Sequence, residues 1–367
     1  MKIDANALIQ ANSSESSISF RISRFFNLGN YVVVAFIIFF LTTVRSGIRI
    51  AYNLDIYRAD SLAFPKIGAY YKSSLIMPIT TKLFHLDSLP KWITFHVLIT
   101  ILTLLIVAYL IFRLHATHNT RLLIALVLFS QLQVVMLTEL GKFDLYLIFG
   151  SILLILNKSI PIQFLGALTI AMGNFEQAIV LLGTLALFSL STDNQLSFKR
   201  YASIGTSAVM FQFLALNTAY GSWSAEGGDS RLNWLTNNWW RFIKANVASL
   251  PTLIYSGYGA CWILIAIYIS KGSTVRNRLI NFMCLILIPL IMTLITFDGT
   301  RIWVIISAPL LLVVLRSFAS LEPIFSTKFQ ISVPVVVFIG LLTPALNVEV
   351  EGKIKIPYLH LWNLLSS

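Results

Sequence analysis

Long apolar runs dominate the chain, and short polar stretches interrupt them. Such runs predict membrane-spanning helices, each of which needs about 20 residues to cross a bilayer upright. We predict about eleven spans, at residues 26–44, 92–112, 122–138, 144–157, 160–173, 177–190, 201–220, 251–270, 279–296, 302–315 and 331–347. The three spans between 144 and 190 are short, so we expect half-helices or a buried hairpin there.

The composition agrees with this pattern. Hydrophobic residues make up 57% of the 367 residues and charged residues only 11%, whereas soluble domains carry about 25% charged residues. A soluble core could not hide this much apolar surface behind so few charges. We therefore expect an all-α, polytopic integral membrane protein. No internal repeat or linker is visible, so we expect one transmembrane domain over residues 1–367.

The distribution of basic residues predicts the orientation. A formal net charge of +12 suits anionic lipid, phosphate-bearing substrates and membrane topology better than nucleic acid. Short loops rich in Lys and Arg stay in the cytoplasm. This rule puts the segment 1–25 in the cytoplasm and predicts a multi-pass protein with a cytoplasmic N-terminus. The long outer loop 45–91 is also basic and argues against this orientation, but its length makes it a weak determinant.

The acidic residues beside the apolar runs then fall on one side of the membrane. They are Asp55, Asp60, Glu139, Asp144, Glu176 and Asp298, with Lys142 and Arg301 close to them in the sequence. Ionisable groups at this depth are costly and normally face one another or a polar cavity. We therefore predict one outward-facing polar cavity that is lined by short loops.

The loop 45–91 carries the two carboxylates that we consider for catalysis. Asp55 and Asp60 lie among Arg49 and Arg58, a combination that suits a general base beside cations for a phosphate leaving group. A solvated, salt-bridged loop would explain the same residues. The end of the loop mixes apolar and basic residues, which predicts an amphipathic helix in the headgroup layer.

Two further polar interruptions are candidates for the cavity. "TELGKFDLY" places Glu139, Lys142 and Asp144 within six positions, and helix capping or local ion pairs explain them as well as substrate contact does. "GNFEQAIV" separates two apolar runs with Asn174 and Glu176. Asn174 could cap the following helix. A turn does not require the charge of Glu176, so Glu176 is a candidate to face the cavity.

The stretch "FDGTR" contains Asp298 and Arg301 at the start of a span. Asp298 suits a helix N-terminus, but Arg301 does not, because that end of the helix dipole is positive. Arg301 should therefore have an anionic partner, which could be Asp298, Glu176 or a ligand phosphate. The alternative is that Arg301 extends to the membrane interface.

The outer loop 221–250 holds Trp223, Trp234, Trp239 and Trp240. Tryptophans of this kind form belts at membrane interfaces, so we expect an amphipathic helix on the outer leaflet. Stacking of the rings on sugars is the alternative.

No metal or cofactor motif is visible. Cys261 and Cys284 lie inside apolar runs and show neither disulfide nor metal-ligand spacing. The chain has no Walker loop, zinc spacing or nucleophile elbow. We expect no cofactor, although a divalent metal is left open.

The layout resembles the GT-C superfamily of polytopic membrane glycosyltransferases. The similarity covers most of the chain: a cytoplasmic N-terminus, about eleven spans, and a first outer loop with "YNLDIYRAD" and "GAYYKSSLIMPITTKLF", then a paired-helix region with "GKFDLY" and "FEQAIV". The resemblance implies a polyprenyl-phosphate-linked sugar donor, a base from the first outer loop and basic groups that hold the phosphate. The chain is also similar to O-antigen or exopolysaccharide polymerases, which have many spans, an outward cavity and essential arginines.

This resemblance implies a glycosyltransferase that moves a sugar from a polyprenyl-phosphate carrier to a sugar acceptor at the outer face of the bacterial inner membrane, in cell-surface glycan synthesis. Asp60 or Asp55 would take the proton from the acceptor hydroxyl. The expected substrate-binding residues are Arg301, Asp298, Glu176, Asp144, Lys142, Glu139, Arg49 and Arg58. The alternatives are the polymerase and, outside enzymes, a transporter or flippase of an anionic lipid-linked glycan. Membrane lipids are expected partners in each case.

Overall fold

The computed structural model describes most of the chain's apolar runs. It covers residues 31–49, 54–64, 73–114, 131–191, 195–220, 231–296, 298–320, 345–348 and 354–355. The segment 1–25, most of the predicted span 331–347 and the first part of the span 122–138 lie outside the described residues.

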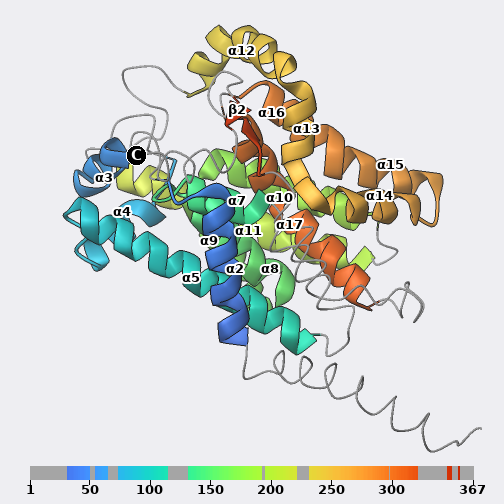
Figure 1. Cartoon of the computed structure of the whole chain (residues 1–367), viewed down its shortest axis with the longest axis horizontal. Helices are drawn as coiled ribbons and strands as arrows, with labels where there is room; N and C mark the ends of the chain where they lie inside the picture. The colour runs from blue at the N-terminus through green and yellow to red at the C-terminus, as the bar shows by residue number, and fades with distance from the viewer. Residues whose placement is uncertain are drawn as a thin grey trace, which may run out of the picture.

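The described residues are almost all helical (Figure 1). In chain order the helices are α2 (Tyr31–Ser46), α3 (Leu54–Leu62), α4 (Ile76–Leu83), α5 (Leu89–Leu114), α7 (Gln131–Thr138), α8 (Asp144–Leu156), α9 (Ile160–Gly173), α10 (Phe175–Ser189), α11 (Gln195–Tyr220), α12 (Arg231–Ala248), α13 (Leu250–Tyr258), η3 (Gly259–Cys261), α14 (Trp262–Ser270), α15 (Val275–Phe282), η4 (Met283–Leu287), α16 (Ile288–Leu294) and α17 (Gly299–Ser320). One short antiparallel pair, β1 (Asn347–Val348) and β2 (Ile354–Lys355), accompanies them. The expected all-α class is confirmed for this part of the chain, apart from that strand pair.

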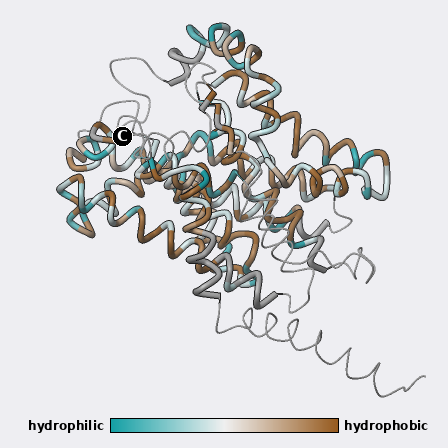
Figure 2. Tube along the Cα trace, viewed as in Figure 1, coloured by the Kyte–Doolittle hydropathy of each residue, from teal (hydrophilic) through white to brown (hydrophobic). Residues whose placement is uncertain are grey.

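Within the described residues, four stretches are long and apolar enough to cross a membrane. They are Leu89–Ile106, Leu250–Ser270, Val275–Leu294 and Gly299–Ser317. These stretches make the chain a membrane protein, as its composition predicts. Figure 2 shows hydrophobic residues along most of the helices and hydrophilic residues gathered on α12 and at the turn between α14 and α15.

Helix α17 is the central helix of the bundle. Of its apolar window, 89% is buried inside the protein, against 28% for the window in α5. It packs against α8, α10, α13 and α16, among others. The N-terminal turn of α17, which carries Arg301, is therefore surrounded by protein.

The short helices α8, α9 and α10 form a tightly packed group. A Cβ atom on Gly150 or on Gly166 would come within 2.6 Å of the other glycine's carbonyl oxygen, so glycine is what permits α8 and α9 to approach this closely. Residues 157–159 join these two helices as a hairpin. The end of α9 at Gly173 consequently returns beside Leu147, near the start of α8. The hairpin brings "GKFDLY" and "GNFEQ" to the same end of the group.

Candidate functional site

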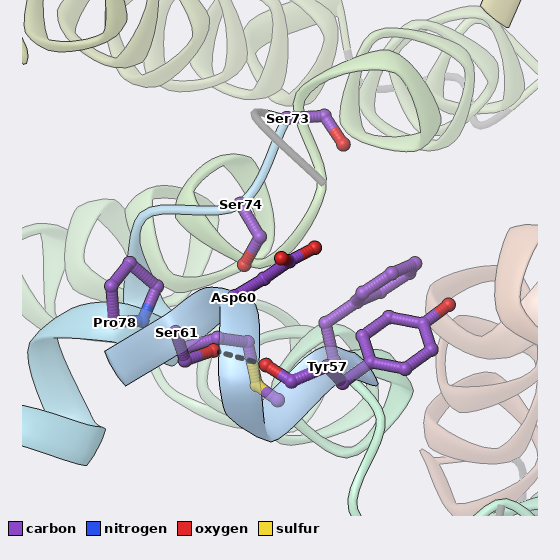
Figure 3. Close-up of a pocket in the computed structure, with 8 residues that line it drawn as sticks. Tyr57, Asp60, Ser61, Ser73, Ser74 and Pro78 are labelled. Atoms are coloured by element: carbon purple, nitrogen blue, oxygen red, sulfur yellow. Dashed lines mark hydrogen bonds between the residues drawn. The ribbon is translucent and has the colours of Figure 1, made fainter. Parts of the chain in front are cut away.

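A small pocket lies between α3, α4 and the residue that precedes α8 (Figure 3). Its lining consists of Tyr57, Asp60, Ser61, Ser73, Ser74, Met77, Pro78 and Phe143. Asp60 points from α3 toward the segment that carries Ser73 and Ser74. The free space between these side chains corresponds to about one water molecule. In this conformation the pocket is polar on one wall but too small for a sugar ring.

The junction between α9 and α10 holds one wall of the pocket in place. Asn174 donates from its Nδ2 to the Ser73 hydroxyl at 3.2 Å, and the backbone N–H of Phe175 donates to the Ser73 carbonyl at 2.9 Å. The Oδ1 of Asn174 accepts from the backbone N–H of Gln177, so Asn174 is the N-cap of α10. One buried asparagine thus starts a helix and anchors the pocket segment. Glu176 lies half-buried in the first turn of the same helix.

The Asp60 carboxylate has a second aromatic neighbour besides Tyr57. It acts electrostatically on the hydroxyl group of Tyr220, the last residue of α11. The Tyr220 ring in turn packs edge-on against Phe64, with centroids 5.8 Å apart. Asp60 is half-buried, so solvent reaches it while the surrounding rings lower the local polarity.

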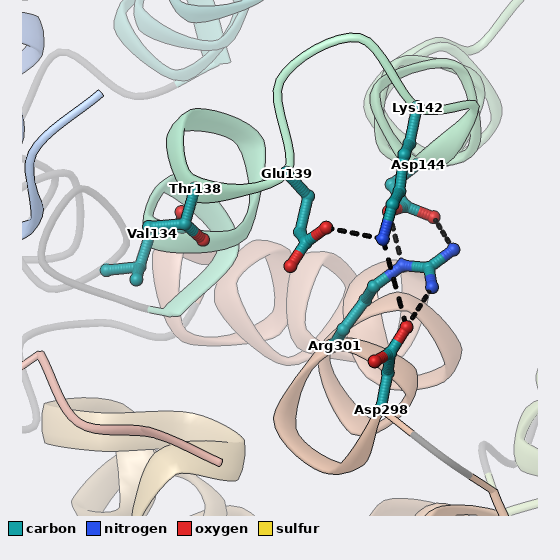
Figure 4. A network of polar contacts seen from close by, with 7 residues as sticks. All are labelled: Val134, Thr138, Glu139, Lys142, Asp144, Asp298 and Arg301. Atoms are coloured by element: carbon teal, nitrogen blue, oxygen red, sulfur yellow. Dashed lines mark hydrogen bonds and ion pairs between the residues drawn. The ribbon is translucent and has the colours of Figure 1, made fainter. Parts of the chain in front are cut away.

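A largely buried network of charged side chains surrounds Arg301 (Figure 4). Arg301 binds Asp144 through two nitrogens, at 2.5 Å from Nε and 3.0 Å from Nη2. Its Nη1 binds Asp298 at 2.5 Å. Lys142 binds Glu139 at 2.6 Å and lies 3.9 Å from Asp298. The network therefore joins three carboxylates to two cations, with α17 on one side and the start of α8 on the other.

The position of Arg301 explains why it needs two acids. It is the third residue of α17, where the helix dipole disfavours a cation, and its side chain is only 9% exposed. Asp144, the bidentate partner, is 1% exposed, so its charge is compensated almost entirely by Arg301. Paired geometry of this kind is what makes a buried ion pair tolerable.

Burial also governs the ionisation of Glu139. It raises the pKa of this carboxyl above its usual value of 4.5, and the attraction of Lys142 and Arg301 offsets only part of the effect. Glu139 in the folded protein therefore holds a proton to higher pH than an ordinary glutamate does.

Phe143 connects the pocket to the network. Its ring lines the pocket and lies 5.3 Å from the Arg301 guanidinium carbon. Tyr57 packs edge-on against the same ring, with centroids 6.1 Å apart. The pocket and the network therefore both contact the Phe143 ring.

The start of α17 is fixed by hydroxyl groups. The Thr300 hydroxyl bonds to that of Ser256 on α13 and accepts from the backbone N–H of Val348 on β1, at 2.9 Å. Both contacts are buried. They hold the turn that presents Asp298 and Arg301 to α8.

The structure thus brings together most segments that the sequence singled out. Arg49 pairs through its backbone with Leu137 and Leu140, beside the Glu139 segment. Arg58 donates to the carbonyl of Asp87, at the turn before α5. Asp55 is on α3, but its side chain lies outside the described part of the chain.

The identity of the anionic partners differs in part from expectation. Asp298 was among the expected partners of Arg301, whereas its main partner, Asp144, was expected to contact substrate, to favour a helix start or to form an ion pair within its own segment. Arg301 binds these two acids rather than Glu176. The pocket hydroxyls of Ser73 and Ser74, and the shared ring of Phe143, were not predicted, because an isolated serine or phenylalanine gives no distinctive pattern.

No group of three or more His, Cys, Asp or Glu residues in the described segments is arranged to hold a metal ion. Cys261 and Cys284 are free and buried. No protein-family model, curated protein or solved structure matches the chain.

Proposed function

We propose that the chain is a GT-C-like membrane glycosyltransferase that uses a polyprenyl-phosphate-linked sugar. It would act at the outer face of the bacterial inner membrane, with a cytoplasmic N-terminus and about eleven spans. The observation that carries the proposal is the adjacency of the Asp60 pocket and the buried Arg301 network across Phe143. A carboxylate that can take a proton and an arginine that can hold a phosphate are the two groups that sugar transfer from a phosphate requires, and here both lie beside Phe143.

Asp60 is the candidate general base. The acceptor hydroxyl loses its proton to this carboxylate as its oxygen forms a bond to the anomeric carbon. The bond from that carbon to the phosphate oxygen breaks at the same time, and the carrier phosphate leaves with the electron pair. The neighbouring Ser73 and Ser74 hydroxyls can donate to and accept from sugar hydroxyls.

The phosphate requires a cation, and Arg301 already has partners. Its two acids are not equivalent, because the Asp298 side chain is 19% exposed and that of Asp144 only 1%. A phosphate could therefore displace Asp298 from Arg301 more readily than Asp144. Lys142, which is 3.9 Å from Asp298, would then compensate the displaced carboxylate. In this scheme Asp144 positions Arg301 and does not contact the substrate.

The small size of the pocket has a mechanistic consequence. A cavity that holds about one water must widen before a sugar can enter. We therefore expect donor binding to move α3 relative to α4, which together supply most of the lining.

The experiment is a transfer assay on the purified full chain in proteoliposomes, with a panel of polyprenyl-phosphate sugars and released polyprenyl phosphate as the readout. Wild-type protein should release the carrier from at least one donor, and Asp60→Asn should not. Asp87→Asn, which removes an exposed carboxylate from the same loop, is the matched control and should retain turnover. No carrier release by wild type with any donor, or equal release by Asp60→Asn, would contradict the proposal.

A transporter is the second candidate, because buried, mutually paired charges also characterise substrate pathways in transporters. The same proteoliposomes distinguish the two functions. A transporter moves an intact fluorescent lipid-linked glycan between leaflets without releasing the carrier. A polymerase would instead extend a lipid-linked glycan by its own repeat, which the length of the product reveals.

A further inference from the structure

Helix α12 lies at the edge of the molecule (Figure 1) and contributes no residue to the Asp60 pocket. Its position is tied to the ends of two candidate spans. The span Leu250–Ser270 begins two residues after α12 ends at Ala248. Asn246 donates from its Nδ2 to the carbonyls of Thr293 and Leu294 at the end of the span Val275–Leu294, at 3.0 and 3.2 Å. Both constraints hold α12 at the level where spans meet the membrane surface.

The helix has one face toward the protein and one face away from it. Phe242 and Asn246, one turn apart, are 2% and 1% exposed. Asn246 satisfies helix-end carbonyls that would otherwise lack donors. On the other side, Trp239 and Trp240 are 47% and 55% exposed. Large apolar rings at this exposure are costly in water and point to a surface that covers them.

The outward face is itself divided into two strips. Trp239, Ile243 and Val247 follow one another at intervals of four residues and share one strip with Trp240. Val247 is 49% exposed. Lys244 and Arg241 follow on the adjacent strip and are exposed.

The two strips meet at a cation–aromatic contact. The Nζ atom of Lys244 lies 5.6 Å from the centroid of the Trp240 ring. The sequence of α12, RLNWLTNNWWRFIKANVA, contains no acidic residue. The exposed side of the helix therefore offers aromatic rings and positively charged side chains next to one another.

We propose that the outward face of α12 docks on the bilayer surface and binds the headgroups of anionic phospholipids. The apolar strip enters the boundary between headgroups and acyl chains, where tryptophan is favoured. The exposed side chains of Lys244 and Arg241 then lie at the level of the lipid phosphates, to which positive charge is attracted. Sugar stacking on these rings is less consistent with the structure, because α12 does not line the pocket.

The first arm of the test asks what covers the tryptophans. The full chain is reconstituted in proteoliposomes whose lipids carry bromine on the acyl chain near the headgroup, and tryptophan fluorescence is measured. The emission lost in Trp239→Phe/Trp240→Phe represents these two rings, and we expect bromine to quench most of it. Trp92→Phe, which removes a fully buried ring, is the matched control and should remove an unquenched component. Unquenched emission from Trp239 and Trp240 would overturn the proposal, and a second copy of the chain or a glycan would then be the occupant.

The second arm asks whether the lipid is anionic. Spin-labelled phosphatidylglycerol and phosphatidylcholine report how strongly each lipid is immobilised by the protein. Arg241→Gln/Lys244→Gln should reduce the preference for phosphatidylglycerol by roughly fivefold per charge removed. Arg241→Lys/Lys244→Arg, which exchanges the two side chains but keeps both positive charges, is the matched control and should keep the preference. Equal losses in both double variants, or no loss in the first, would contradict specific headgroup binding by α12.

Discussion

The Asp60 pocket and the Arg301 network share the Phe143 ring, yet their carboxylates differ in burial. In the network, each ionised group contacts an opposite charge, and Asp144 and Arg301 are 1% and 9% exposed. In the pocket, the half-buried Asp60 faces hydroxyl groups and room for a water. Close pairing is the response to burial, whereas the half-buried carboxylate of Asp60 lines a pocket that a ligand can reach.

The comparison distinguishes a carboxylate that lines a pocket from a carboxylate that holds a buried arginine, a distinction that the sequence alone does not show. Asp60, Asp144 and Asp298 are equally conspicuous in an apolar sequence, because each interrupts it with a charge. The structure commits Asp144 to Arg301 and leaves Asp298 partly exposed beside two cations. We therefore expect variants of Asp60 to lose turnover with the fold intact, and variants of Asp144 to lose the fold first.

The largest effect should come from Asp60→Asn. Loss of a general base typically reduces turnover ~10²–10⁴-fold, while the isosteric amide keeps the packing of the pocket. The measurements are carrier release in the transfer assay and thermal unfolding in detergent. Asp55→Asn is measured in parallel. If both variants keep near-normal turnover, the base lies elsewhere, and Glu176 is the next candidate.

The second effect concerns the stability of the buried pair. Arg301→Met or Asp144→Leu alone leaves one buried charge without its main partner, which costs about 3–5 kcal/mol in comparable cases. The double variant removes both charges and should be less destabilised than either single variant. Thermal unfolding of the wild type, the two single variants and the double variant gives the coupling free energy between Arg301 and Asp144.

Arg58→Met is the matched control for this cycle, because Arg58 makes its described hydrogen bond to a backbone carbonyl near the surface. It should change the unfolding temperature far less than Arg301→Met does. Additive effects of the two network substitutions would show that the Arg301–Asp144 contact contributes little, and the contrast with the pocket would then fail.

A third, smaller effect should appear as a pH dependence. The pKa of Glu139 is raised in the folded protein, so the folded state binds this proton more tightly than the unfolded state does. The associated stability is fully present below the usual value of 4.5 and is lost as pH rises through the raised pKa. Glu139→Gln removes this dependence. As pH rises from 4 to 8, the unfolding temperature of wild type should fall relative to that of the variant. If the two unfolding temperatures change in parallel with pH, the raised pKa of Glu139 is contradicted.

Helix positions were largely predictable from the sequence in the α8–α10 group. The predicted runs 144–157, 160–173 and 177–190 correspond to α8, α9 and α10 within about two residues at each end, because polar turns separate them. The runs 251–270 and 279–296 were each expected as one α-helix. In the structure, a 3₁₀-helical turn, η3, interrupts the first run, and a π-helical segment, η4, interrupts the second. Hydropathy measures the polarity of a run and is insensitive to its internal hydrogen-bond pattern.

The site was predictable as a set of segments but not as a set of contacts. Asp298 and Arg301 are three residues apart, so their pairing on one helical turn could be anticipated. The partnership with Asp144 spans 157 positions and depends on how α17 packs against α8. Ser73 and Ser74 were missed for a related reason, since their role arises from the turn at Asn174.

The smallest effect should come from an exposed ion pair on the same loop as Asp60. Lys91 and Asp87 lie 2.8 Å apart, with side chains 56% and 63% exposed. The hydrogen bond from Lys91 lowers the pKa of Asp87 below its usual value of 3.8. Its contribution to stability is therefore present above that value and is lost as pH falls, opposite in sign to that of Glu139. Because water screens the pair, Asp87→Asn should leave the unfolding temperature at pH 7 unchanged within error. A loss as large as that of Asp144→Leu would show that exposure does not distinguish the two kinds of ion pair in this protein.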